Sequence, residues 1–120
     1  MNRWVLLEHK ISRPLLSEVH FDFLIENKSD CLTWKIYEIP KLNGTPIEII
    51  KQPNHRLVWL TTESKLLSGD RGYVQRVDYG KYTIVENNLS EDNFCLKLDG
   101  NFLRGFLKKQ YDLCNLYKYS

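Results

Sequence analysis

The amino-acid sequence predicts a mainly β protein, an antiparallel β-barrel of about six to eight strands with one short helical turn. The first observation is a series of short segments with apolar residues at every second position, as a strand with one buried face requires. The second is the placement of turn residues between these segments, at intervals of roughly 8 to 12 residues. The third is that almost no sustained helical period occurs. A two-sheet sandwich fits the same observations and remains open.

Residues 19–26 have the clearest strand pattern. Val, Phe, Phe and Ile alternate there with His, Asp, Leu and Glu, so the second group shares the opposite face. Before this segment, residues 4–9 are expected to form a first strand, and residues 12–18 a capped helical turn, because a serine begins it and a proline follows. After it, turn residues 27–30 lead to a second alternating segment, residues 32–39, which is expected to complete a hairpin.

The rest of the chain is expected to form short strands separated by turns. Residues 47–50 and 55–62 are apolar enough for two strands, and residues 63–72 are the longest expected loop, the usual place for substrate contacts. Two further hairpins are expected, one around Tyr79-Gly80 and one around the stronger turn signal Asp99-Gly100-Asn101. Their strands are residues 73–78, 82–86, 94–98 and 102–107, and residues 111–119 fit a strand or a short helix.

Length and composition restrict the class of protein. The 120 residues fit one domain, residues 1–120. Seventeen Lys and Arg residues against fifteen Asp and Glu residues give a net charge of +2, so a nucleic acid would be held by a local patch. Three cysteines without a CxxC pair argue against a disulfide framework or a thiolate zinc site, and indicate reduced thiols in a cytoplasmic protein. Neither a signal peptide nor a membrane partner is expected.

Three histidines and one aspartate are the candidate metal-binding and catalytic residues. His20 and Asp22 lie two positions apart on one expected strand, so their side chains share a face at a spacing of about 7 Å. His9 ends the first expected strand, and His55 begins a later one. Two imidazoles and a carboxylate favour manganese, iron or zinc, and leave coordination positions open to water and substrate. The alternative is an ordinary strand with a wet face and three unconnected surface histidines.

Several motifs, in order along the chain, resemble the 3′-phosphoesterase domain of bacterial DNA ligase D, and the similarity is greatest to its short stand-alone relatives. LLEH ends at His9, HFDFLIE begins at His20, and NHRLVWL contains His55. The resemblance continues through LTW, SGDRG and VDYGKY to LDGNFLRGFL near the C-terminus. The ordered combination covers most of the chain.

The resemblance implies a cofactor, an activity and partners. His9, His20 and Asp22 would hold a divalent cation, manganese by preference, and His55 would face the scissile phosphate. The family trims the 3′ end of a DNA primer strand by removing a terminal ribonucleoside and then the 3′-phosphate, which leaves a hydroxyl that a polymerase or ligase uses. The implied partners are therefore a primer–template DNA 3′ end and a DNA ligase or polymerase.

Three positions depart from the family pattern. Leu24 stands where the family usually has an arginine that clamps phosphate, Trp59 where it has a tyrosine, and Leu7 where it has a glutamine. Arginine is the strongest bidentate phosphate donor, so another cation has to replace it if phosphate binding survives. The candidates are Arg56, Arg71 and Arg76, of which Arg71 in the SGDRG segment is favoured.

Other functions stay open. A catalytically impaired homologue would keep the metal and bind nucleic-acid ends or a partner protein, with aromatic residues as stacking surfaces for bases. The same aromatic residues also fit a core or a barrel girdle. The HxD pair with a distant histidine also matches iron- and 2-oxoglutarate-dependent oxygenases, and a cupin would use His20, Asp22 and Glu26. The aromatic residues in question are Trp34, Trp59, Tyr73 and Tyr79.

Overall fold

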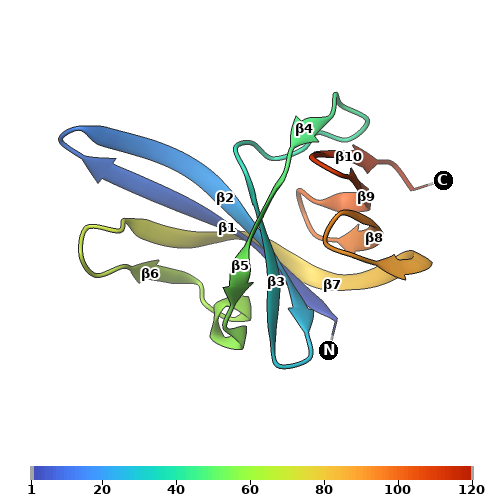
Figure 1. Cartoon of the computed structure of the whole chain (residues 1–120), viewed down its shortest axis with the longest axis horizontal. Helices are drawn as coiled ribbons and strands as arrows, with labels where there is room; N and C mark the ends of the chain where they lie inside the picture. Colours follow the sequence, from blue (N-terminus) through green and yellow to red (C-terminus); the bar gives the residue numbers. More distant parts are fainter. Residues whose placement is uncertain (1, 120) are drawn as a thin grey trace.

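The computed structural model contains one large antiparallel sheet and one short 3-10 helix, η1 (Figure 1). It describes residues 2–119, apart from the side chains of residues 86–88. The helix η1 spans Leu57–Leu60. The strands are β1 (Arg3–Arg13), β2 (Leu16–Asn27), β3 (Asp30–Ile36), β4 (Ile47–Glu48), β5 (Ile50–His55), β6 (Ser64–Leu66), β7 (Tyr73–Leu89), β8 (Asn93–Asp99), β9 (Arg104–Gln110) and β10 (Leu113–Tyr117).

The sheet has an open strand order. It runs β4-β10-β9-β8-β7-β1-β2-β3-β5, with β6 paired to β7 outside this path. The mainly β, antiparallel class is therefore confirmed, and the short helical turn of the described residues is η1 rather than residues 12–18. The sheet has ten strands rather than six to eight, and among the described residues no pairing of β4 with β5 closes it into a barrel.

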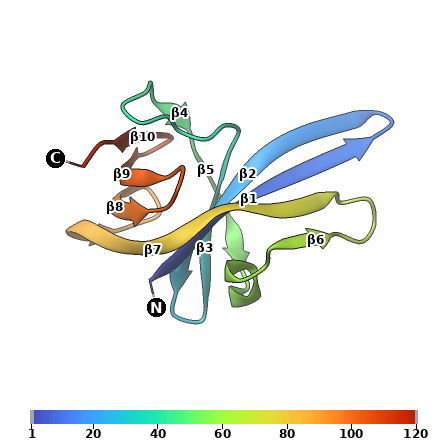
Figure 2. The ribbon, with the colours of Figure 1, turned by 180° about the vertical axis from the view of Figure 1, so that it is seen from behind.

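The long strand β7 belongs to both parts of the sheet. Its first half pairs with β1 and β6 and its second half with β8, and Figure 2 shows it running across the molecule. The hairpin expected around Gly80 is therefore wrong, because the strand continues through this residue. A Cβ at Gly80 would lie 2.2 Å from Oδ1 of Asp99 and 3.1 Å from Nε1 of Trp4. This glycine permits close packing and does not mark a turn.

Strands β1 and β2 form a long hairpin where a helical turn was expected. Their pairing continues from Trp4 opposite Ile25 to Arg13 opposite Leu16. The chain reverses at Pro14 and Leu15, where the fixed φ of proline favours a tight turn as readily as a first helical turn. The expectation was wrong for this reason, and the longer hairpin extends beyond the rest of the sheet (Figure 1).

Both faces of β1 and β2 are buried over residues 4–7 and 20–25, each against its own apolar cluster. The larger cluster joins apolar side chains of β1, β2 and β3 to those of β8, β9 and β10. Phe21, Phe23 and Ile25 of β2 belong to it, as the alternation predicted, whereas Val19 is 46% exposed. The smaller cluster lies on the opposite face and consists of Val5, Leu7, Leu24, Cys31, Leu60 and Val74.

The helix η1 covers the smaller cluster. Residues 55–62 were expected to form a strand, but β5 ends at His55 and η1 follows. One tight turn brings Leu57, Trp59 and Leu60 onto the cluster, which an extended strand with alternating faces would not do. The hairpin of β8 and β9 is confirmed, and the C-terminal segment forms the strand β10.

Arg3 and Glu26 join the start of β1 to the end of β2. Arg3 donates from Nε at 3.1 Å and from Nη2 at 2.9 Å to the carboxylate of Glu26, and its backbone N–H adds a third bond at 3.1 Å. The side-chain hydrogen bond with Arg3 is the main cause that lowers the pKa of Glu26 from 4.5 to about 2. A lowered carboxyl pKa stabilises the fold above pH 4.5, and this contribution is lost as the pH falls towards 2.

The variant Glu26→Gln is expected to unfold at a lower urea concentration at pH 7, with a loss of about 1 kcal/mol. The loss is small because Arg3 is 41% exposed and solvent screens the pair. The difference from the unmodified protein should shrink below pH 4.5 and disappear near pH 2. Urea titrations at pH 7, 4 and 2.5 measure it, and Glu91→Gln, at a more exposed pair with Lys51, is the control. An equal difference at all three pH values would contradict the assignment.

Candidate metal centre

Three predicted metal ligands meet on the face of β1 and β2 that carries the smaller cluster. His9 lies directly opposite His20 in the strand register, and Asp22 lies two residues further along β2 on the same face. One ligand atom from each of these three residues lies within 4.8 Å of the other two. His20 and Asp22 are 7% and 9% exposed. The register produces this convergence, because opposite residues and same-face neighbours of an antiparallel pair lie close together.

Hydrogen bonds leave one nitrogen of each imidazole for a cation. His9 donates its Nε2–H to the backbone carbonyl of Arg71 at 2.6 Å, since a carbonyl can only accept. His20 donates its Nδ1–H to Oε2 of Glu18 at 2.8 Å. The remaining nitrogens are Nδ1 of His9 and Nε2 of His20, and the second lies 3.4 Å from Oδ1 of Asp22. Two imidazole nitrogens and a carboxylate, each ring oriented by an acceptor, fit a divalent transition metal.

The charge around His20 favours its protonated form when no cation is bound. The hydrogen bond with Asp22 is the largest cause that raises the pKa of His20 above 6.5, and the charges of Asp22 and Glu18 add to it against the opposing effect of burial. A divalent cation bound at this cluster would therefore compete with a proton for this ring. The affinity for a divalent cation is expected to rise with pH beyond 6.5.

Glu18 is a residue of the site that the sequence analysis did not select. It stands two positions before His20, on the same face of β2 as His20 and Asp22. The period of two that joined His20 to Asp22 also includes Glu18, so the signal was present in the sequence. Its carboxylate fixes which nitrogen of His20 carries the proton.

Glu18→Ala is expected to weaken manganese binding by about 10- to 100-fold, the usual effect of removing an acceptor from a metal-bound histidine. Glu18→Gln keeps an oxygen acceptor and should restore most of the affinity. Calorimetric titration with Mn²⁺ measures the affinities. Nitrogen NMR shifts of the His20 ring, recorded without metal at a pH where the ring is neutral, report whether Nδ1 still carries the proton. Equal affinities for all three proteins would show that Glu18 does not orient the ring.

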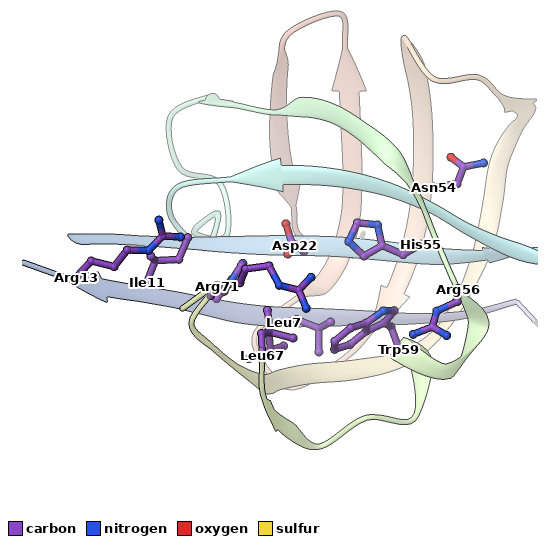
Figure 3. A pocket seen from close by; sticks show the side chains of 12 residues that line it. Leu7, Ile11, Arg13, Asp22, Asn54, His55, Arg56, Trp59, Leu67 and Arg71 are labelled. Atoms are coloured by element: carbon purple, nitrogen blue, oxygen red, sulfur yellow. The ribbon is translucent and has the colours of Figure 1, made fainter. Parts of the chain in front are cut away.

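The metal-ligand cluster opens into a cleft of about 520 Å³ that also contains the other predicted site residues (Figure 3). His9 and Asp22 line it together with His55 and Arg71, so segments that are distant in the sequence share one cavity. His55 donates from Nδ1 to the carbonyl of Pro53 at 3.0 Å, which leaves Nε2 for a ligand. The full lining is Leu7, His9, Ile11, Arg13, Asp22, Asn54, His55, Arg56, Trp59, Leu67, Arg71 and Val74.

Arg71 is held beside the cluster by its own loop. Its guanidinium donates from Nε to the carbonyl of Ser68 at 2.8 Å and from Nη2 to Oγ of Ser68 at 3.0 Å. Figure 3 shows its side chain extending into the cleft between Asp22 and Trp59. Gly72 fixes the loop against β1, since a Cβ there would lie 2.2 Å from the carbonyl oxygen of Lys10, and its φ of +100° disfavours other residues.

Gly72→Ala is expected to lower manganese affinity several-fold, because the loop has to move away from β1 and take the Arg71 carbonyl away from His9. Gly69→Ala is the matched control, since Gly69 also has a positive φ, +66°, but a Cβ there meets nothing within 4 Å. Both variants carry backbone strain of about 1 kcal/mol, and only the first disturbs the packing. Calorimetric titration with Mn²⁺ measures the affinity of the two variants. Equal losses of affinity would exclude a specific role for the contact with β1.

The positions that depart from the family pattern have different surroundings. Leu24 is fully buried in the smaller cluster and faces Val5 across the strand pair, so it offers no polar contact to a ligand. Leu7 and Trp59 line the cleft. Of the three arginine candidates, Arg56 and Arg71 line the cleft, whereas Arg76 stacks on Tyr79 at 4.0 Å and pairs with Glu63 at 3.7 Å.

The structure places the residues that a cupin site and a base-stacking surface would need in different surroundings. Glu26, which a cupin site would need, pairs with Arg3, and the cluster within 4.8 Å contains His9 in its place. Trp34 is fully buried in the larger cluster and is a core residue. Trp59 lies at the cleft, and Tyr73 and Tyr79 are 40% and 56% exposed.

Burial makes two of the cysteines unreactive at neutral pH. It raises the pKa of Cys31 to about 11 and that of Cys114 to about 12. Both thiols therefore stay protonated, and a thiolate metal site is not favoured at either position.

Comparison with known proteins adds no family assignment: no protein-family model matches the chain, and no curated protein matches it. Within residues 2–119, the structure has no helix with the length and apolarity required to cross a membrane.

Proposed function

We propose that the protein is a divalent-metal-dependent phosphoesterase that processes DNA 3′ ends by removing a 3′-phosphate or a terminal ribonucleoside. The observation that carries the proposal is the meeting of His9, His20 and Asp22 in one cluster, of which His9 and Asp22 line a cleft together with His55 and Arg71. The ordered motifs that resemble the 3′-phosphoesterase domain of DNA ligase D support the same assignment. In this proposal the partner is a primer–template DNA end. Removal of the 3′ group leaves a hydroxyl that a ligase or polymerase can use.

Each residue of the cleft has a role in this proposal. His9, His20 and Asp22 hold the cation, manganese by preference. When bound, it supplies Lewis-acid neutralisation of charge on a phosphate oxygen. Arg71 adds a fixed positive charge beside the same phosphate, in place of the arginine that Leu24 replaces. Water forms the new bond to phosphorus while the bond from phosphorus to the sugar oxygen breaks, and His55 in its protonated form gives a proton from Nε2 to this leaving oxygen.

The test is phosphate release from a primer that ends in a 3′-phosphate and is annealed to its template. The unmodified protein with Mn²⁺ is expected to release phosphate, and the activity should disappear on chelation and in His20→Ala. His55→Ala should bind Mn²⁺ normally but release phosphate about 10²- to 10⁴-fold more slowly, the usual contribution of a general acid. Failure of the unmodified protein to release phosphate or ribonucleoside would overturn the proposal.

A catalytically impaired homologue is the second candidate, and the burial of Leu24 favours it. The side chain at this position belongs to an apolar cluster, so the phosphate clamp expected there is lost. This alternative predicts calorimetric binding of Mn²⁺ and binding of a DNA end without turnover. An oxygenase would instead consume 2-oxoglutarate in an iron-dependent reaction, and that result would exclude both candidates.

A further inference from the structure

The cleft is longer than the metal-ligand cluster. Four residues of β1 at every second position line it: Leu7, His9, Ile11 and Arg13. Six residues of extended strand cover about 20 Å, so the lined face continues well past His9 in the direction of the β1–β2 turn. Figure 3 shows Arg13 at one end of the cleft and Arg56 at the other, with Arg71 between them. A single phosphate would occupy only a part of this length.

The lining combines two kinds of surface that a nucleic-acid strand requires. Three arginines, at positions 13, 56 and 71, supply positive charge, and Asp22 is the only acidic residue among the lining residues. Ile11, Leu67 and Trp59 supply apolar and aromatic surface between the charges. Phosphates pair with the first kind and exposed base faces with the second. Base faces are hidden inside a paired duplex, so the apolar surface fits unpaired nucleotides.

Arg13 is placed to bind a phosphate away from the reacting end. Its Nε donates to the backbone carbonyl of Asp70 at 2.8 Å, which fixes the plane of the guanidinium at the edge of the cleft. A guanidinium carries five N–H donors in a planar fork, and this bond uses one of them. Arg13 lies four residues from His9 on the same strand, a distance of about 13 Å. That distance corresponds to about two to four nucleotides.

We propose that the last few nucleotides of the primer, unpaired from the template, lie in the cleft along β1, with the terminal phosphate at the His9, His20 and Asp22 cluster and an upstream phosphate on Arg13. This inference rests on the proposed function, because it takes the metal-ligand cluster as the position of the terminal phosphate. It assigns a subsite to Arg13 and makes the substrate an oligonucleotide end. A mononucleotide fills the site only in part.

The experiment measures kcat/KM for phosphate release with Mn²⁺ on single-stranded DNA 3′-phosphates of one, two, four, six and eight nucleotides. We expect kcat/KM to rise with length and to level off at about four to six nucleotides. In Arg13→Ala the ratio of kcat/KM between the hexanucleotide and the mononucleotide should fall about tenfold, the effect of one charge-assisted phosphate contact. Arg104→Ala, an exposed arginine on β9 that stacks near Tyr119, is the matched control and should keep the original ratio.

Binding without turnover separates this inference from the proposed function. Fluorescence anisotropy with the same oligonucleotides should show affinity that rises with length, and Arg13→Ala should reduce the salt dependence by about 0.7 in the slope of log K against log salt concentration. If the protein shows this binding pattern but releases no phosphate, the proposed phosphoesterase activity is wrong and the Arg13 subsite is supported. The Arg13 subsite would be wrong, and the phosphoesterase activity supported, in either of two cases. The first is phosphate release from the mononucleotide as fast as from the hexanucleotide, and the second is faster release from a blunt duplex than from the single-stranded hexanucleotide.

Discussion

Replacing Asp22 with asparagine is expected to weaken manganese binding by more than about 100-fold and to stop phosphate release. Even the outer partners of metal ligands typically contribute 10- to 100-fold, and Asp22 is the one carboxylate in the cluster of described ligand atoms. An amide oxygen keeps the size of the side chain but removes the negative charge that attracts the cation. The substitution also removes the main group that raises the pKa of His20, so the pKa of this ring should fall.

Calorimetry with Mn²⁺ and the phosphate-release assay measure the effect of Asp22→Asn. The control is Asp112→Asn in the exposed turn between β9 and β10, which makes the same chemical change far along the sheet from the cleft. Circular dichroism and a urea titration establish that both variants are folded. Manganese affinity that stays within threefold of the original would mean that the three residues do not form a metal site.

Replacing Asp78 with asparagine is expected to cost about 3 kcal/mol of unfolding free energy. Asp78 is 1% exposed, and its two carboxylate oxygens accept four backbone hydrogen bonds. Oδ1 accepts from Tyr79 and Asn101, and Oδ2 accepts from Phe102 and Leu103. An amide can accept at one oxygen only, so two buried N–H groups would face an NH₂ group and lose their partners.

Thermal and urea unfolding of Asp78→Asn measure this cost, and Asp112→Asn again serves as the exposed control. A loss of about 3 kcal/mol lowers the melting temperature by roughly 10 °C in a domain of this size. Manganese affinity at low temperature should change little, because Asp78 holds the loop before β9 and does not line the cleft. A melting temperature within 2 °C of the original would show that the loop is not held by this carboxylate.

The sequence predicted the elements whose patterns are local. The alternation in β2 and β3 and the turn at Asp99-Gly100-Asn101 are visible in a few consecutive residues, and the structure contains the corresponding hairpins. Gly80 was misread because a glycine in a strand signals either a turn or a close contact, and only its neighbours Trp4 and Asp99 in space decide which. Pro14 was misread because proline suits both a first helical turn and a hairpin turn.

The candidate site was predictable in part for the same reason. The placement of the His20 and Asp22 side chains on one face follows from the period of two along a single strand. The approach of His9 depends on the register between β1 and β2, which the residues of either strand alone do not specify. Arg13 was overlooked because its segment was expected to be helical, and its place in the cleft appears only when β1 extends to residue 13.

The burial of both faces of β2 over residues 20–25 also protects the site from strand slippage. A shift of β2 by one residue would send His20 and Asp22 into the larger apolar cluster and bring Phe21 and Phe23 out towards the cleft. An unpaired carboxylate and imidazole in that interior would cost several kcal/mol, so misregistered states are strongly disfavoured. The two apolar clusters thus fix the register of β2 and with it the positions of His20 and Asp22. Substitutions around the cleft that leave these clusters intact should therefore leave the ligand positions unchanged.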